Sequence, residues 1–253
     1  MYAGAMKDNL SANRLVLENV SHNYDALAVL RNLNLCVNAG ELLVIVGPSG
    51  CGKTTLLNIL SGYIKPVSGT VTIDGIIRTV YQQDGLFPWL TVIENIAMGL
   101  RDVTSTVQRE KELKELIELI HLEGFEQHYP HQLSGGMRQR VELARVLAGD
   151  SDILLMDEPF SALDYQTRLR MRHELVRLLR KRPRTVVFVT HDIEEAAQLA
   201  DRVLVLSNRP AHISKELFIE APTPRNPTDD AVIEAAKAIL DELGLQTSVI
   251  KDV

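Results

Sequence analysis

One stretch of this 253-residue chain constrains its fold more than any other: a glycine-rich loop between an apolar segment and a helix-like segment. The loop matches the pattern G-x-x-x-x-G-K-[ST]. Its residues are Gly47, Pro48, Ser49, Gly50, Cys51, Gly52, Lys53 and Thr54. Glycines let the backbone curl, so that N–H groups and the N-terminus of the following helix face a polyphosphate. The sequence therefore predicts a strand, a phosphate-binding loop and a helix, the central unit of an α/β fold.

The residues at the end of the loop suggest how a nucleotide would be held. Lys53 would place a positive charge between the outer phosphates, and the hydroxyl of Thr54 would ligate Mg²⁺. Thr55, the next residue, is assigned to the same nucleotide site. The alternative is a glycine turn that only joins a strand to a helix. The complete pattern in the correct context disfavours that alternative.

A second element supports a phosphate site, because residues 153–158 form an apolar strand that ends in two carboxylates. One acid at such a strand end can belong to the Mg²⁺ shell while its neighbour acts on a water. We therefore expect Asp157 to hold the metal and Glu158 to polarise the attacking water as the general base. A solvated acid at a strand end is the alternative interpretation of Glu158, and the phosphate loop earlier in the chain makes it less favoured.

Composition excludes several classes of protein. A hydrophobic fraction of 45% and a charged fraction of 24% are typical of globular domains. The net charge of -6 argues against a nucleic-acid partner. The apolar runs are too short for a membrane helix, and the polar N-terminus lacks the features of a signal peptide, so we expect a cytoplasmic chain. Two cysteines form neither a disulfide framework nor a four-ligand zinc site by themselves.

The pattern along the chain predicts one large α/β domain over 15–253, after a tail at 1–14. Apolar residues recur with helical period between 113 and 120 and the β signal disappears, so we expect a helical subdomain inserted at 83–149. Strands and helices alternate after 152, which indicates a parallel sheet. We expect strands at 15–20, 28–37, 42–47, 153–157, 185–190 and 202–206, and helices at 53–60, 166–181, 193–199 and 231–243.

Residues 133–140, LSGGMRQR, resemble the signature of the ABC ATPase family, which usually reads LSGGQ. Met137 stands here in place of the glutamine. A serine cap and two glycines open a helix, so this segment offers N–H groups and a helix dipole to an anion. Ser134, Gly135 and Gly136 would form this second phosphate-binding end. An ordinary capped helix is the alternative, which the phosphate loop disfavours.

The resemblance extends to other positions. It implies that Tyr24 stacks on adenine, that Gln82 senses Mg²⁺ and the permease, and that His191 contacts the γ-phosphate. Gln83 competes with Gln82 for the glutamine role. Residues 161–164 resemble the loop by which two subunits touch beside the catalytic acid.

From these positions the resemblance implies a P-loop NTPase core with an N-terminal antiparallel β subdomain and an inserted α-helical subdomain. It also implies ATP hydrolysis with ATP and Mg²⁺ by a homodimer, bound to two membrane permease subunits at the cytoplasmic face of the membrane. An external solute-binding protein would act indirectly, and no nucleic acid is expected. Segments 86–92 and 209–210 resemble the nitrate, sulfonate and bicarbonate importer group, which includes taurine importers. The short connection 75–81 departs from that group and predicts a trimmed hairpin.

Two other functions remain open at this point. One is a soluble ABC protein acting on DNA or ribosomes, which is disfavoured because the chain has neither a sustained heptad run nor a second phosphate loop. The other is a non-hydrolysing regulatory subunit, which Lys53, Asp157 and Glu158 argue against. Basic residues within 166–184 are interpreted as a solvated helix face. The cargo stays open among taurine, other sulfonates, nitrate, bicarbonate and thiamine precursors.

Overall fold

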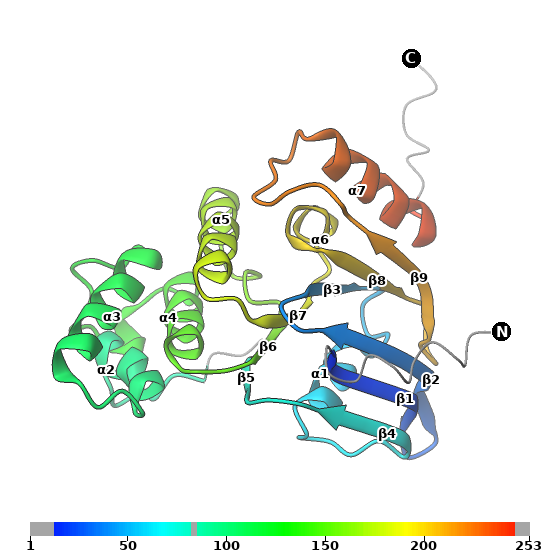
Figure 1. Ribbon diagram of the computed structural model, residues 1–253, viewed down its shortest axis with the longest axis horizontal. Helices are drawn as coiled ribbons and strands as arrows, with labels where there is room; N and C mark the ends of the chain where they lie inside the picture. The colour runs from blue at the N-terminus through cyan, green and yellow to red at the C-terminus, as the bar shows by residue number, and fades with distance from the viewer. Residues whose placement is uncertain (1–12, 82–84, 246–253) are drawn as a thin grey trace. The chain divides into compact units, whose positions relative to one another are not determined.

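A computed structural model describes residues 13–81 and 85–245 of the chain. The chain divides into two compact units (Figure 1). The first unit comprises Met1–Gly75 and Pro183–Val253, and the second comprises Ile76–Arg182.

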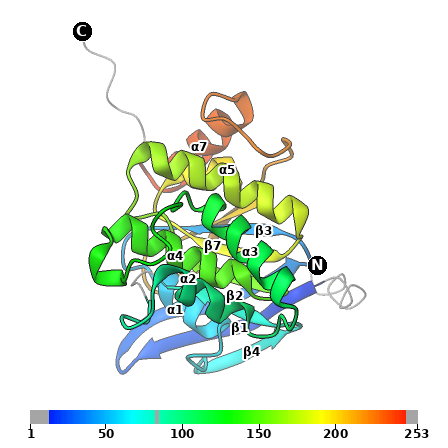
Figure 2. The same cartoon turned by 90° about the vertical axis from the view of Figure 1, so that its left-hand side faces the viewer.

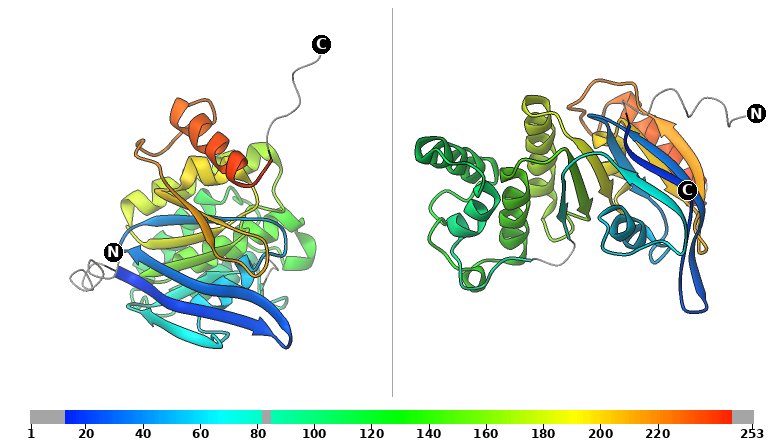
Figure 3. Two further views of the ribbon diagram at one scale, coloured as in Figure 1. Left: turned by 90° about the vertical axis from the view of Figure 1, so that its right-hand side faces the viewer. Right: turned by 60° about the horizontal axis from the view of Figure 1, so that its bottom comes forward.

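The first unit contains an antiparallel sheet of three strands in the order β2-β1-β4 (Figure 3). These strands are β1 (Asn13–Tyr24), β2 (Leu27–Asn38) and β4 (Ser68–Ile73). Inward-facing residues of β1 such as Leu15 and Leu17 are completely buried, while outward-facing neighbours are partly exposed. This alternation is typical of a sheet with one buried face. The antiparallel subdomain was expected from the resemblance, but strand β4 was not anticipated because its residues are mostly exposed.

The first unit also contains the parallel strands that hold the phosphate loop. Strand β3 (Leu42–Val46) lies between β7 (Thr185–Val189) and β8 (Arg202–Leu206) and is parallel to both. Every residue of these three strands is buried, as expected for parallel strands covered on both faces. The predicted parallel sheet is confirmed. Strand β9 (Ile213–Phe218), antiparallel to β8, was not predicted.

Three helices complete the first unit: α1 (Lys53–Leu60), α6 (Ile193–Leu199) and α7 (Asp230–Glu242). Helix α1 buries its apolar face and contacts β4 and β7, whereas α6 packs on β3 and against α7 (Figure 1). The carboxylate of Asp192 caps α6, accepting from the N–H groups of Glu194 at 2.9 Å and Glu195 at 3.1 Å. Strand β3 and helix α1 thus fix both ends of the phosphate loop.

The second unit contains a parallel pair of strands, β5 (Ile77–Val80) and β6 (Ile153–Asp157). The connection 75–81 was expected to be a trimmed hairpin, and this prediction was wrong. Strand β4 pairs with β1, whereas β5 pairs with β6, so the two strands on either side of Gly75 are not partners in a hairpin. The connection is short because β5 begins directly after it.

Helices make up most of the second unit (Figure 2). They are α2 (Val92–Ala97), α3 (Thr106–Leu119), α4 (Gly135–Ala148) and α5 (Tyr165–Lys181), with the 3₁₀ turns η1 (Met98–Leu100) and η2 (Pro130–Gln132). Helices α2, α3 and α4 pack against one another, and α4 also packs on β5. No residue described between 85 and 149 lies in a strand. The limits 83–149 for a separate helical subdomain remain a prediction.

Among the residues that the structure describes, no helix has both the length and the apolar character needed to cross a membrane.

Candidate functional site

The phosphate loop joins β3 to α1 in a conformation that requires glycine. Gly52 has a φ of 124°, and a Cβ atom added there would lie 2.8 Å from a methyl carbon of Val29 and 2.9 Å from one of Leu30. Any other residue at this position would therefore be strained and would also clash with β2. The last turn of the loop, at Gly52, therefore packs against strand β2 of the antiparallel sheet.

Lys53 is folded back into the loop and is largely buried. Its ammonium group donates to the carbonyl of Gly47 at 2.7 Å and to that of Pro48 at 3.1 Å. An ammonium group has three donors, so these two bonds position the charge and leave a third donor for a phosphate oxygen. The N-cap residue of α1 is Gly52, which has no side chain to cap the helix, and this leaves the first N–H groups open to an anion.

The remaining residues of the loop differ in their exposure to solvent. Ser49, Gly50 and Thr54 are exposed, so the Thr54 hydroxyl is accessible from outside, while Thr55 is buried behind it. Cys51 is also buried, and burial raises the pKa of its thiol although Lys53 acts in the opposite direction. The thiol therefore stays protonated and packs as a small side chain.

Arg209 was not predicted as a site residue, yet it lies beside the phosphate loop. Its guanidinium nitrogen is 3.8 Å from the position of a Cβ on Gly50. The side chain is exposed, which leaves its donors accessible to an anion. The sequence signal was the Arg209-Pro210 pair, which was noted only as a marker of the importer group.

Two other predicted residues belong to the first unit. Tyr24 is the last residue of β1 and is 46% exposed, so its ring can receive a flat ligand. His191 is exposed between β7 and the Asp192 cap of α6. Gln82 and Gln83 lie outside the described residues, so the choice between them stays open.

The two predicted carboxylates follow each other at the end of β6 in the second unit. Asp157 is buried as the last strand residue. Glu158 has a φ of 48°, in the left-handed region that a non-glycine residue rarely adopts. This conformation turns the chain sharply directly after Asp157, so the neighbouring side chains leave the strand in different directions. Strained backbone of this kind is concentrated at functional sites.

Gln139 of α4 holds the loop that follows these carboxylates. Its amide nitrogen donates to the carbonyl of Glu158 at 3.1 Å, and its amide oxygen accepts from the N–H of Ala162 at 3.0 Å. The hydroxyl of Ser161 donates to the same Glu158 carbonyl at 3.0 Å. Gln139 was not predicted as a site residue, because a glutamine inside a helix carries no local signal of such a role.

The same loop packs against the start of the signature helix. A Cβ on Gly136 would lie 3.0 Å from the carbonyl oxygen of Ala162, so a larger residue would push this loop away. Gly135 has more room. The hydroxyl of Ser134 caps α4 by accepting from the N–H of Met137 at 3.2 Å. The predicted serine cap is therefore present.

Asp164 ends this loop and caps α5. Its carboxylate accepts from the hydroxyl of Thr167 at 2.6 Å and from its N–H at 3.0 Å. These two bonds lower the pKa of Asp164, the hydroxyl having the larger effect. From Asp157 to Asp164 the chain is thus anchored at several points on α4 and α5.

A magnesium ion would need ligands beyond these side chains. Among the described residues, no group of three or more His, Cys, Asp or Glu side chains can hold a metal by itself. A threonine hydroxyl and a carboxylate such as those of Thr54 and Asp157 are oxygen ligands of the kind that Mg²⁺ prefers. Each of them could serve an ion that takes its other ligands from nucleotide phosphates and water.

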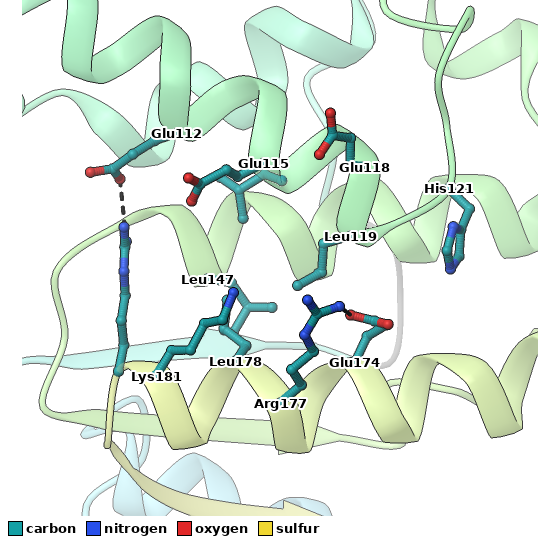
Figure 4. A pocket seen from close by; sticks show the side chains of 12 residues that line it. Glu112, Glu115, Glu118, Leu119, His121, Leu147, Glu174, Arg177, Leu178 and Lys181 are labelled. Carbon is teal, nitrogen blue, oxygen red and sulfur yellow. Dashed lines mark hydrogen bonds and ion pairs between the residues drawn. The ribbon is translucent and has the colours of Figure 1, made fainter.

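Two hollows in the second unit lie apart from the predicted nucleotide residues. One, of about 300 Å³, lies between α3 and α5, and its rim contains the ion pairs Glu112–Arg182 at 3.3 Å and Glu174–Arg177 at 3.6 Å (Figure 4). Its lining has four glutamates against three arginine or lysine side chains, so it does not favour a polyphosphate.

The other hollow, of about 350 Å³, is lined by residues of β5, of α4 and of the segment from Gly85 to Arg101. Helix α4 holds this segment, since Arg145 donates to the carbonyl of Gly85 at 2.8 Å and lies over the ring of Phe87. Phe87 in turn packs against Trp89, which is 70% exposed.

The family model described as ABC transporter matches residues 30–161. An uncharacterized ABC transporter ATP-binding protein of Methanocaldococcus jannaschii is 44% identical over 243 residues, 91% of each chain. The aliphatic sulfonates import ATP-binding protein SsuB of Bacillus cereus is 40% identical over 87% of this chain and 92% of its own. The taurine import ATP-binding protein TauB of Roseobacter denitrificans is 42% identical over 82% and 81%.

Among solved structures, the dimeric structure of a bacterial ABC transporter cassette has a TM-score of 0.74 and 35% identity. It covers 82% of this chain and 100% of that chain. The family and the α/β fold class implied by the resemblance are confirmed. This chain belongs to the ABC transporter family, as one of its ATP-hydrolysing, ATP-binding subunits.

Proposed function

We propose that this chain works as a head-to-tail homodimer at the cytoplasmic face of a membrane, where hydrolysis of ATP-Mg drives import of a small sulfonate-type solute through a permease. One observation carries the proposal: the chain has two helix N-termini opened by glycines, one on α1 and one on α4. A single triphosphate would contact both of these helix N-termini only if they came from different subunits.

The phosphate loop binds the triphosphate of its own subunit. The N–H groups at the start of α1 and the third donor of Lys53 contact phosphate oxygens, while the exposed hydroxyl of Thr54 faces the metal. Tyr24 stacks on the adenine. These residues account for binding and orientation, and they do not require the second subunit.

Hydrolysis uses the residues after β6 together with His191. Glu158 accepts a proton from the attacking water as the oxygen of that water bonds to the γ-phosphorus and the bond to the bridging oxygen breaks. Asp157 orients the metal shell, and His191 donates a hydrogen bond to the γ-phosphate. Thr54 and Asp157 would hold a magnesium ion, which would supply positive charge to offset that of the phosphates.

The signature helix of the partner subunit closes this site. The N–H groups of Gly135 and Gly136 and the dipole of α4 face the γ-phosphate across the dimer. ATP thus joins two subunits, and loss of the γ-phosphate separates them. The related cassette solved as a dimer supports this assembly.

The hollow beside Phe87 and Trp89 is proposed to receive a cytoplasmic segment of the permease. An exposed tryptophan packed on a second aromatic ring is a common anchor at protein interfaces. The predicted sensing glutamine, Gln82, precedes this segment directly in the sequence. Closure of the dimer would then move the attached permease helices.

The cargo proposal depends on the relatives. Two of them are named for import of aliphatic sulfonates and of taurine, so a sulfonate is favoured over nitrate, bicarbonate or thiamine precursors. An external solute-binding protein would deliver it. The same relatives disfavour a soluble ABC protein acting on DNA or ribosomes.

The assembly can be tested with Glu158→Gln protein, which should bind ATP without hydrolysing it. We expect it to dimerise in ATP and magnesium, as measured by light scattering, and to stay monomeric in ADP. A monomer under both conditions contradicts the head-to-tail model. Wild-type protein reconstituted with its permease should release phosphate, and no release would restore the regulatory-subunit alternative.

The permease surface can be tested by Trp89→Ala, with Tyr63→Ala as a matched control, since Tyr63 is 78% exposed on the first unit. We expect Trp89→Ala to lose copurification with the permease while ATP binding is kept. The purified complex should then take up labelled taurine or an alkanesulfonate in vesicles. If the complex took up nitrate but neither sulfonate, the sulfonate assignment would be refuted and the rest of the proposed function would stand.

A further inference from the structure

The backbone on either side of His191 is held by one buried hydroxyl group, that of Thr190. Thr190 follows β7 directly and is only 2% exposed. Its hydroxyl accepts a hydrogen bond from the N–H of Asp192 at 2.9 Å and donates one to the carboxylate of Glu195 at 2.6 Å. One side chain therefore bridges the turn across His191, although His191 itself is exposed.

The carboxylate of Glu195 holds this hydroxyl in place. Glu195 lies in the first turn of α6 and is buried. Burying a carboxylate is costly unless hydrogen bonds satisfy it, and Thr190 supplies one of these bonds. The separation of 2.6 Å is in the range of hydrogen bonds between a hydroxyl and an ionised carboxylate, which are stronger than bonds between neutral groups. The hydroxyl of Thr190 is thus fixed between two partners.

The backbone of Thr190 connects the same turn to the strand that leads into the phosphate loop. Its N–H donates to the carbonyl of Ile45 in β3 at 3.2 Å. Gly47, two residues after Ile45, begins the phosphate loop. The backbone of His191 therefore starts from a point that is fixed relative to the loop proposed to hold the phosphates.

A hydrogen bond from an imidazole to the γ-phosphate requires an accurately placed ring, since a displacement of about 1 Å is enough to lose a productive geometry. We propose that Thr190 is a positioning residue for His191. Its hydroxyl, held by Glu195, fixes the turn so that the imidazole reaches the γ-phosphate. This inference rests on the proposed contact of His191 with the γ-phosphate, and it adds the residue that holds His191 in position.

A purely structural role of Thr190 makes a different prediction. If its hydroxyl only stabilises the start of α6, removing it should lower the Tm and leave nucleotide recognition unchanged. Thr185, at the other end of β7, provides a matched control. It is 1% exposed, and its hydroxyl accepts from the N–H of Gly40 at 3.0 Å and donates to the carbonyl of Asn38 at 3.4 Å. Thr185→Val therefore also removes a buried, hydrogen-bonded hydroxyl.

The test measures how strongly each protein prefers ATP over ADP, because only ATP carries the γ-phosphate. Variants are made in a Glu158→Gln background, which prevents turnover, and titration calorimetry with magnesium gives each Kd. We expect Thr190→Val to lower the preference for ATP about tenfold, the equivalent of about one hydrogen bond, with ADP affinity unchanged. Thr190→Ser retains the hydroxyl and should retain the preference. Thr185→Val should also retain it, despite a lower Tm.

A double variant shows whether Thr190 acts through His191. His191→Ala should itself lower the preference for ATP, and adding Thr190→Val should lower it no further, because the ring to be positioned is gone. A further loss in the double variant would mean that Thr190 acts by another route, which contradicts the proposal.

Glu195→Gln provides a second test, which remains available if the valine variant does not fold. It keeps an oxygen acceptor for the hydroxyl of Thr190 but removes the charge. We expect the preference for ATP to fall by a smaller factor than in Thr190→Val, and only while His191 is present. An unchanged preference would show that the carboxylate does not hold the turn.

Two further results would overturn the proposal in different ways. If Thr190→Val keeps the preference for ATP, as Thr185→Val does, Thr190 has a structural role only and the proposed contact of His191 with the γ-phosphate stands. If His191→Ala keeps the preference of the parent, that contact is refuted, and the role of Thr190 is refuted with it.

Discussion

The N-termini of α1 and α4 both begin with glycines, but they are built differently. Helix α1 has no side-chain cap, and the ammonium group of Lys53 lies against the loop before it. Helix α4 is capped by the hydroxyl of Ser134 and packs through Gly136 on the backbone of Ala162. The end of α1 is left open beside the ammonium group of Lys53. The end of α4 is closed by the hydroxyl of Ser134, and its nearby cation, Arg138, donates to the carbonyl of Leu133 at 2.8 Å.

This difference indicates that the two helix N-termini have different roles in nucleotide binding. Open N–H groups beside a fixed cation can bind a polyphosphate without help. A helix end that is already capped gains less from an anion and offers only its remaining N–H groups and its dipole. The end of α1 is suited to hold the nucleotide, and the end of α4 is suited to recognise a nucleotide that is held elsewhere.

The largest expected effect is a loss of ATP affinity when the open N-terminus of α1 is changed. Lys53→Ala removes the only side-chain cation donating into the loop in the described hydrogen-bond network, and we expect ATP affinity to fall by about 100-fold, as for loss of a charged hydrogen bond in a buried site. Calorimetry with the monomer measures it. Lys65→Ala, an exposed lysine of the same unit, is the control. Equal affinities for the two variants would show that the loop does not hold the phosphates.

Changes at the closed N-terminus of α4 should lower stability and turnover but not the ATP affinity of the monomer. Gly136→Ala pushes against the carbonyl of Ala162, and we expect a loss of about 1 to 3 kcal/mol in unfolding free energy together with a large loss of turnover. Monomer binding of ATP should stay unchanged, since in the proposed dimer α4 contacts only the nucleotide bound by the other subunit. Gly135→Ala, whose Cβ would meet only a flexible arginine end at 3.8 Å, should cost less than about 0.5 kcal/mol in stability. Weaker ATP binding by the Gly136→Ala monomer would remove the distinction between the two ends.

Gln139→Ala tests what holds the closed end in place. The change leaves the N–H of Ala162 without its partner, and we expect about 1 to 3 kcal/mol of destabilisation, measured by denaturant unfolding. Turnover should fall because the loop after Glu158 loosens. Gln166→Ala, on the exposed side of α5, is the matched control. A Gln139 variant as stable and active as that control would mean that the loop is held by packing alone.

The sequence predicted the open end more completely than the closed one. Residues 47–54 form a contiguous pattern whose spacing already describes a loop between a strand and a helix, and the structure has that arrangement. Fully apolar runs such as Val44-Ile45-Val46 also gave correct buried strands. These features depend on residues that are neighbours in the chain, so a local pattern is enough to find them.

Features that depend on distant residues were missed. The contact of Gln139 with Glu158 and Ala162 joins two segments about twenty positions apart, and no local pattern marks it. Strand β9 has alternating exposure and three consecutive polar residues, Ser214 to Glu216, so its pairing with β8 decides its structure. The supposed hairpin at 75–81 failed for the same reason, because strand partners are chosen by the whole sheet.

The smallest expected effect concerns the acidic cap that follows the closed end. Hydrogen bonds from Thr167 lower the pKa of Asp164 below its ordinary value of 3.8, so its ionised form is stabilised by folding. That stability is complete above the unfolded pKa and is lost as the pH falls through the lower, folded pKa. Asp164→Asn keeps a capping oxygen without the charge. We expect wild type to have the slightly higher Tm at pH 7, and the advantage to disappear as the pH falls below 3.8 and through the lowered pKa of Asp164.

Thr167→Val separates the two causes of this shift, because it removes the hydroxyl donor and keeps the N–H donor. The acid-induced loss of Tm should then be smaller and should be complete at a higher pH than in wild type, since the folded pKa moves back toward its ordinary value. An unchanged pH profile would assign the shift to the backbone and the dipole of α5. The Asp164 cap of α5 would then depend on the geometry of the backbone alone.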